Sequence, residues 1–107
     1  MEDKYNVLSL EDSRDFIRSI REFNPSLILL DIMMPNKTGF ECLNEIKQIE
    51  DLKDIPIIMI TALADHDSIK KAIESGAFEY IKKPIITYEL LAKINTALIF
   101  KENNDKI

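Results

Sequence analysis

Short apolar runs alternate with longer amphipathic stretches along the whole chain. Four segments of four to six residues are rich enough in apolar residues to predict β-strands. They are Tyr5–Leu10, Leu27–Leu30, Ile57–Ile60 and Phe78–Lys82. The second and third are apolar without interruption, which is typical of strands covered on both faces of a parallel sheet.

Each strand is followed by a stretch whose apolar residues recur at helical spacing. The predicted helices are Asp12–Phe23, Phe40–Ile49 after the loop Pro35–Gly39, Ser68–Ser75, and Thr87 to about Lys101. Asp12 or Ser13 is expected to cap the first helix, because both side chains accept hydrogen bonds from free backbone amides. Gly76 is expected to end the third helix as its C-terminal cap.

The regular alternation predicts an α/β fold of the (βα)4 type. Strands alternating with helices favour a parallel sheet with helices packed on both faces. At 107 residues and 12.4 kDa, the chain is long enough for one domain with a single hydrophobic core, and we expect residues 1–107 to form it.

Composition and charge exclude several classes of function. Hydrophobic residues make up 46% and charged residues 31%, an ordinary balance for a globular protein, and the net charge is −5. A negative charge disfavours direct binding of nucleic acid and anchoring to an acidic membrane surface. The stretch Ile55–Ala64 is too short to span a bilayer. The single cysteine, Cys42, is expected to be a buried or half-buried residue, and it suits a cytoplasmic location.

Polar residues stand at the carboxyl ends of the last three predicted strands. Asp31, Thr61 and Lys83 directly follow these strands. Ligands of open parallel sheets bind at that edge, where these side chains would meet. Asp can act as a nucleophile toward phosphorus, and a hydroxyl and an ammonium can donate to the phosphoryl oxygens. Taken singly, each residue has a plainer interpretation: a turn residue, a helix cap and a surface charge.

Three ordered motifs resemble those of response-regulator receiver domains. The first is Leu27–Pro35, with Gly39 eight residues beyond Asp31. The second is Ile57–Ala62, and the third combines Gly76-Ala77, Tyr80 and Lys83-Pro84. The intervals of 30 residues from Asp31 to Thr61 and 22 from Thr61 to Lys83 fit the family without gaps. The resemblance covers nearly the whole chain and implies a flavodoxin-like parallel sheet.

The resemblance implies a phosphorylation switch rather than an enzyme. Asp31 would accept a phosphoryl group from a sensor histidine kinase, while Thr61 and Lys83 would bind the phosphoryl oxygens. Tyr80 would be the aromatic switch residue, and Asp31 with the backbone carbonyl of Met33 would bind Mg²⁺. The Lys83-Pro84 peptide would be cis, and the last strand and helices would contact an output protein.

The start of the chain departs from the family pattern. Receiver domains usually have the (βα)5 form and open with a strand that carries two Mg²⁺-binding acids. Only one strand–helix unit precedes Asp31 here, which predicts that the first unit is absent and that Mg²⁺ binds weakly. In a second alignment, Leu8–Ser13 is the first strand with its acids, and about 25 residues are deleted internally. With the usual central strand gone, as in the first alignment, Tyr5–Leu10 could pair with Leu27–Leu30 and bring Glu11 and Asp12 near Asp31 as a substitute pair of metal ligands.

Other functions remain open on the residues alone. A degenerate receiver could serve as an interaction or oligomerisation module without phosphorylation. A small flavodoxin-like ligand binder is disfavoured, because no Ser-, Thr- or Gly-rich phosphate loop follows a strand. An aspartyl-phosphate hydrolase is disfavoured because Met33, not an acid, stands two residues after Asp31.

The chain is also expected to self-associate. The hand of the crossovers puts three helices on one face of the sheet and leaves only the last helix for the other. The second face would therefore be incompletely covered, and exposed apolar patches of several hundred Å² are rare in monomers. Leu91, Ile94 and Leu98 are the expected contact residues.

Overall fold

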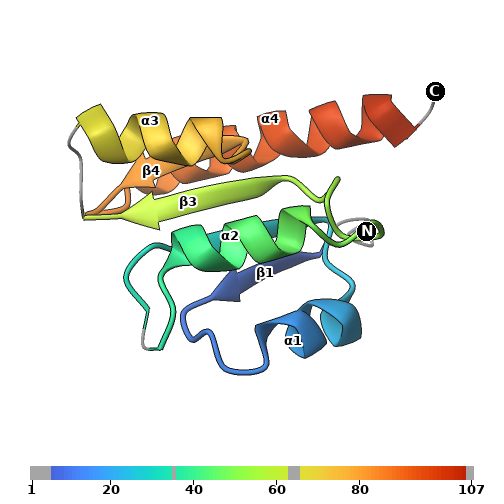
Figure 1. Cartoon of the computed structure of the whole chain (residues 1–107). Coiled ribbons are helices and arrows are strands. Elements are labelled where there is room, and N and C mark those ends of the chain that lie inside the picture. The colour runs from blue at the N-terminus through green and yellow to red at the C-terminus, as the bar shows by residue number, and fades with distance from the viewer. Residues whose placement is uncertain (1–5, 35, 63–65, 106–107) are drawn as a thin grey trace.

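A single parallel sheet forms the centre of the molecule. The computed structural model describes residues 6–34, 36–62 and 66–105, the last four of these for the backbone only. The strands are β1 (Val7–Leu10), β2 (Leu27–Asp31), β3 (Ile57–Thr61) and β4 (Glu79–Lys82). They lie in the order β1-β2-β3-β4, and all three neighbouring pairs are parallel (Figure 1). The predicted α/β class and strand positions are confirmed.

Each strand leads into a helix. The helices are α1 (Phe16–Phe23), α2 (Gly39–Lys47), α3 (His66–Glu74) and α4 (Thr87–Asp105). Consecutive strands are neighbours, so right-handed crossovers place α1, α2 and α3 on the same face of the sheet and leave α4 for the other. Among the helices of the described residues, none is both long and apolar enough to cross a bilayer.

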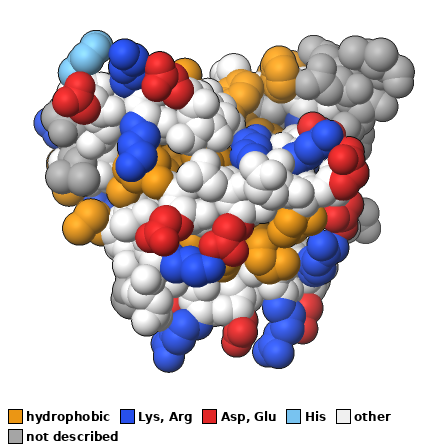
Figure 2. Space-filling model, viewed as in Figure 1, with side chains coloured by type: hydrophobic (Ala, Val, Ile, Leu, Met, Phe, Trp, Pro, Cys, Tyr) orange, Lys and Arg blue, Asp and Glu red, His pale blue; other side chains and the backbone are white. Residues whose placement is uncertain are grey.

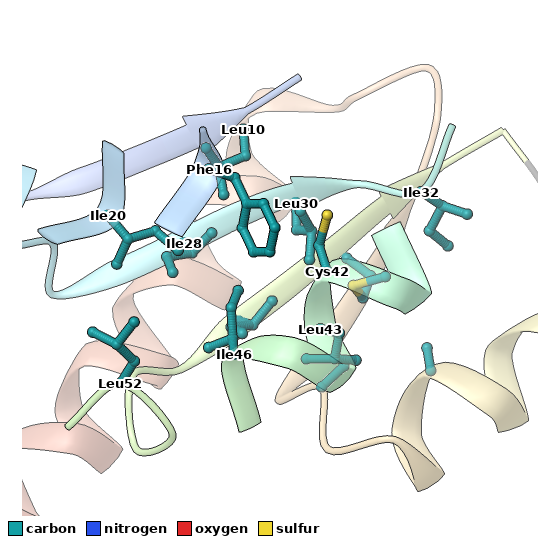
Figure 3. Packing of buried hydrophobic residues seen from close by; sticks show 14 residues of the cluster. Leu10, Phe16, Ile20, Ile28, Leu30, Ile32, Cys42, Leu43, Ile46 and Leu52 are labelled. Atoms are coloured by element: carbon teal, nitrogen blue, oxygen red, sulfur yellow. The ribbon is translucent and has the colours of Figure 1, made fainter. Parts of the chain in front are cut away.

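The larger part of the core lies between the sheet and α1–α3. Alternate residues of the central strands, such as Ile28, Leu30 and Met59, are fully buried there. Figure 3 shows Phe16 and Ile20 of α1 reaching toward β2, beside the buried side chains of α2. The period-two alternation of strand side chains thus fixes which residues face these helices.

The opposite face is better covered than expected. Leu27 and Ile58 are completely buried there, because α4 packs Ala97 and Leu98 against them. The expected gap in cover over β2 and β3 is therefore absent. Ile94 and Leu98 face this core, so the prediction that they are available to a partner is wrong, and only Leu91 of the three is exposed.

The start of α1 differs from the prediction. The helix begins at Phe16, and its N-cap Asp15 has a left-handed backbone with φ of 53° and no side-chain cap bond. Asp12 does not cap the helix because its carboxylate accepts from the backbone N–H of Arg14 at 2.9 Å. Ser13 is buried, and its hydroxyl accepts from the backbone N–H of Lys37 at 3.2 Å. Both candidate caps are thus engaged by other donors.

The remaining boundaries agree within a few residues. Gly76 follows α3 with φ of 104°, and the next amide, that of Ala77, donates to the carbonyl of Ala72 at 3.0 Å, which confirms the predicted glycine cap. Helix α4 runs past the predicted end to Asp105. Tyr5 and Pro35, which the sequence placed in a strand and a loop, lie outside the described residues.

Candidate functional site

Asp31 is the last residue of β2, and two donors hold its carboxylate. The backbone N–H of Met33 donates to Oδ1 at 3.0 Å, and the ammonium of Lys83 donates to Oδ2 at 2.8 Å. The side chain of Asp31 is 16% exposed and that of Lys83 is 43% exposed. The carboxylate is therefore oriented from both sides while one part of it still faces solvent.

Lys83 reaches Asp31 from a segment 52 residues away. Its backbone N–H donates to the carbonyl of Thr61 at 2.8 Å, which continues the β3–β4 pairing by one residue. The Lys83-Pro84 peptide is cis, as the resemblance implied. The hydrogen bond and the charge of Asp31 raise the pKa of Lys83, with a smaller contribution from Glu11. A raised pKa means that the Lys83 ammonium stays charged at neutral pH and loses its charge only as the pH rises through that pKa.

Thr61 and Tyr80 lie on the other face of the sheet from Asp31. Along β3, Met59 faces the α1–α3 side and Ile60 the α4 side, so alternation returns Thr61 to the α1–α3 side. Thr61 is 1% exposed, and Tyr80 is half-buried against the α1–α3 core. Thr61 and Tyr80, to which the resemblance gives roles in a switch, therefore lie on the same face of the sheet.

Gly39 packs directly against the end of β2, the strand that carries Asp31. Its backbone N–H donates to the carbonyl of Ile32 at 2.8 Å. A Cβ atom at this position would lie 2.5 Å from the carbonyl oxygen of Asp31 and 2.8 Å from Cα of Ile32. The motif thus needs glycine here because the start of α2 touches the backbone that carries the aspartate.

A pocket of about 230 Å³ opens beside Asp31 on the α4 side of the sheet. Glu11 and Lys83 also line it. The prediction that the first strand pairs with the Asp31 strand is confirmed, and its register matches Leu10 with Leu30. The next residues along the two strands, Glu11 and Asp31, therefore lie side by side at the carboxyl edge of the sheet.

The second candidate acid, Asp12, is engaged elsewhere. Both of its carboxylate oxygens bond the guanidinium of Arg14, at 2.8 Å for the shortest contact, and it does not line the pocket beside Asp31. Within the described ranges there is no group of three or more His, Cys, Asp or Glu side chains that could hold a metal ion. Glu11 is thus the better placed of the two predicted acids.

Cys42 has the ordinary structural role that the sequence suggested. It is fully buried in α2, and burial raises the pKa of its thiol to about 11. The thiol therefore stays protonated at neutral pH and is a poor nucleophile.

The sequence analysis did not identify the apolar residues that line the pocket beside Asp31. Leu29, Ile60 and Ile85 line the pocket together with Ser9. Strand alternation could have identified Leu29 and Ile60. Leu29 lies two residues before Asp31 and so on the same face, and Ile60 on β3 is the register partner of Asp31. Ile85 follows the cis proline, and no sequence pattern points it toward the site.

Comparisons with known proteins show the family and the fold of the chain. Residues 1–95 match the family described as "Response regulator receiver domain". The phosphate regulon transcriptional regulatory protein PhoB of Pseudomonas aeruginosa is 38% identical over 94 residues, which are 88% of this chain and 41% of that protein. The probable transcriptional regulator ycf27 of Porphyridium aerugineum is 36% identical over 94 residues, 88% of this chain and 38% of that protein. The chain thus spans about two fifths of the length of these relatives.

Solved structures show the same fold. The signal receiver domain of a putative Luxo repressor protein from Vibrio parahaemolyticus superposes with a TM-score of 0.86 at 24% identity, covering 96% of each chain. The receiver domain of a signal transduction histidine kinase from Syntrophus aciditrophicus gives a TM-score of 0.76 at 25% identity, covering 88% of this chain and 89% of that one.

Proposed function

The chain belongs to the response regulator receiver domain family, and from this we propose that it is a switch phosphorylated on Asp31. Receiver domains of two-component systems interact with histidine kinases, and as a class they are generally not enzymes. The observation that carries the proposal is the ion pair of 2.8 Å between Asp31 and Lys83, which joins the acceptor to its charge partner at the carboxyl edge of the sheet.

The proposed reaction transfers a phosphoryl group from a kinase phosphohistidine. A carboxylate oxygen of Asp31 attacks phosphorus, the new O–P bond forms as the N–P bond of the phosphohistidine breaks, and the histidine nitrogen leaves with its electron pair. The product brings a charge of about −2 and three acceptor oxygens to the site. Lys83 is placed to donate to one of these oxygens. We assign the Thr61 hydroxyl to another; because Thr61 is buried on the α1–α3 side of the sheet, this bond requires Thr61 to turn toward the carboxyl edge on phosphorylation.

The residues of the site fit Mg²⁺. The ion prefers oxygen ligands and is usually held by one or two carboxylates together with phosphate oxygens and waters. Asp31, Glu11 and the backbone carbonyl of Met33 offer that chemistry, and the first two line one pocket. When bound, the ion would neutralise part of the charge on the transferred group. Glu11 would stand alone in place of the family's acidic pair, and we therefore propose that the affinity for Mg²⁺ is weak.

We also propose that Tyr80 reports the state of Asp31. Tyr80 is half-buried on the same face as Thr61, and β4 carries it three residues before Lys83. A new phosphoryl oxygen that accepts hydrogen bonds from Thr61 and Lys83 would therefore change the surroundings of Tyr80 from two directions, through β3 and through the end of β4. The surface around β4 and α4 would then be read by an output protein.

A titration with beryllofluoride, a stable mimic of the phosphoryl group, tests the proposed function. With Mg²⁺ present, amide signals of ¹⁵N-labelled protein are expected to shift around Asp31, Thr61 and Lys83. Fluoride with Mg²⁺ alone is the control. Shifts scattered over the surface, or none at millimolar concentration, would instead favour the phosphorylation-independent interaction module.

Replacing Glu11 by glutamine is expected to weaken Mg²⁺ binding by roughly tenfold, since a carboxylate ligand becomes a neutral amide. Calorimetry of the wild-type protein and the variant measures the change. Asp12→Asn is the matched control, because Asp12 is bound to Arg14 and does not line the pocket. Equal loss in both variants would show that the acids act through general charge and not as ligands.

Self-association is proposed through the outer side of α4. Tyr88, Leu91 and Ile99 are 78%, 58% and 53% exposed and recur at helical spacing, so this helix is apolar toward solvent as well as toward the sheet. Sedimentation equilibrium at micromolar concentration is expected to show dimers that Leu91→Glu disrupts. Ile73→Glu, at a similarly exposed position on α3, is expected to leave them intact. A strictly monomeric wild-type protein would refute this proposal.

We propose that residues 1–107 form one receiver domain. The supporting observation is that β1, β2, β3 and β4 form one continuous parallel sheet. The relatives carry the name of transcriptional regulators, but we propose no nucleic-acid contact for this domain, because the net charge of the chain is −5. Acidic and basic side chains are also intermixed on the face shown in Figure 2. Free, buried Cys42 supports a cytoplasmic location.

A further inference from the structure

A second hollow lies at the opposite end of the sheet from Asp31. It has a volume of about 710 Å³, within the range of small-molecule sites. Its lining comes from segments just before β3 and β4, such as Pro56 and Phe78, and from the ends of α2 and α4. We call it the basal pocket. It shares no lining residue with the pocket beside Asp31.

One wall of the basal pocket is aromatic. The rings of Phe78 and Phe100 have centroids 5.4 Å apart and are tilted by 54°. Ile55 and Pro56 continue this wall, and Phe100 is still 52% exposed. Helix α4 has 19 residues, and its far end extends beyond the sheet (Figure 1). Phe100, near that end, lines the pocket. The wall can therefore accept a flat apolar group.

The lining also carries positive charge. Lys47, Lys53 and Lys101 line the basal pocket, with Asp54 as the single acid among its described lining residues. The whole chain has a net charge of −5, so the basal pocket reverses the average charge of the protein. Anionic ligands are the ones that this charge distribution favours.

Of the three lysines that line the basal pocket, Lys47 is the best placed to bind an anion. Its stem packs over Gly76, where a Cβ would come within 3.0 Å of the lysine Cε, and its ammonium donates to the carbonyl of Lys53 at 3.0 Å. Among the described residues it forms no salt bridge, whereas Lys53 is paired with Glu50 at 3.0 Å. Burial lowers the pKa of Lys47, and the charge of Asp54 opposes this shift to a smaller extent. An ammonium that is ordered, partly desolvated and not directly bonded to a carboxylate gains more from an anion than a solvated one does.

We propose that the basal pocket binds a small organic anion with a flat apolar body. A carboxylate or phosphate would bind Lys47, and the apolar part would lie against Phe78 and Phe100. Substrates of open parallel sheets occupy the carboxyl edge, whereas this pocket lies at the amino edge. The ligand would therefore be an effector or a stabilising ligand whose binding does not require Asp31.

The test uses 2-naphthoate as the probe, with the neutral 2-naphthamide as its matched analogue. Titration of the ¹⁵N-labelled 107-residue chain is expected to give saturable shifts at Lys47, Ala77 and Phe78. The amide is expected to bind more weakly by roughly tenfold, the effect of one charge-assisted hydrogen bond. Lys47→Met is expected to lower the affinity for naphthoate by a similar factor, whereas Lys70→Met, at an exposed position on α3, is expected to leave it unchanged.

A second variant keeps the test informative if Lys47→Met does not fold. Phe100→Ala removes a half-exposed ring and is expected to weaken both naphthoate and naphthamide. The Asp31→Asn variant is expected to bind naphthoate as the wild type does, so the result is independent of phosphorylation. Equal affinity for acid and amide would overturn the anion assignment. Absence of saturable shifts, or shifts outside the basal pocket, would overturn the site.

Discussion

Replacement of Asp31 by asparagine is expected to abolish phosphorylation by a small-molecule phosphodonor. Asparagine keeps the shape of the side chain but has no anionic oxygen to attack phosphorus, and the other acids of the described site are less well placed. Glu11 lacks the paired donors that orient Asp31, and Asp12 is bound to Arg14. Intact-mass spectrometry after incubation with phosphoramidate measures the gain of one phosphoryl group.

The control for this variant is Asp67→Asn, which changes an exposed acid in the first turn of α3. It is expected to be labelled like the wild type. A second readout comes from Lys83, whose pKa is raised chiefly by its hydrogen bond to Asp31, so that pKa should fall in Asp31→Asn. Labelling that persists in Asp31→Asn and maps to another carboxylate would show that the acceptor is assigned to the wrong residue.

The position of Asp31 and Lys83 could be predicted because it depends on simple rules. Uninterrupted apolar runs identified β2 and β3 as central strands, and parallel strands bring their carboxyl ends to one edge. The sequence alone therefore placed Asp31 and Lys83 at that edge, and the structure joins them directly. Their contact needs only the order of the elements and no knowledge of side-chain packing.

Other features depend on tertiary contacts that no local pattern encodes. The predicted start of α1 was wrong because the Ser13 hydroxyl accepts a hydrogen bond from the backbone N–H of Lys37, which lies 24 residues away. The cover of the α4 face was underestimated because α4 lays Ala97 and Leu98 over β2 and β3 instead of turning them outward. Local spacing identifies the apolar residues of a helix, but not which apolar side meets the sheet when both sides are apolar.

The position of β1 bears on both ways of aligning the chain with its family. Under either alignment, pairing with β2 in the register Leu10 to Leu30 sends Glu11 toward Asp31. An acidic residue at the end of the strand beside the acceptor is what the second alignment expects of the family's first strand. The first alignment explains the same position as a replacement of a missing strand. Glu11 has the same proposed role in both.

Replacement of Gly39 by alanine is expected to destabilise the fold by about 2 kcal/mol, the range for an overpacked core position. Gly39 does not have positive φ, so the expected cost comes from contact and not from backbone strain. The added methyl group would meet the carbonyl oxygen of Asp31 at 2.5 Å, and a backbone atom of a central strand cannot turn aside as the tip of a side chain can. Denaturation by urea measures the change in unfolding free energy.

Asn44→Ala is the matched control, because Asn44 is exposed on the same helix and its replacement should change stability by no more than about 0.5 kcal/mol. The clash at Gly39 can be relieved only if the start of α2 and the end of β2 move apart. That movement displaces Asp31 from Lys83, so the Gly39→Ala variant should also be phosphorylated more slowly than its loss of stability alone explains. A variant as stable as the wild type and phosphorylated at the same rate would show that α2 does not need to touch the acceptor strand. The glycine of the motif would then have no part in positioning Asp31.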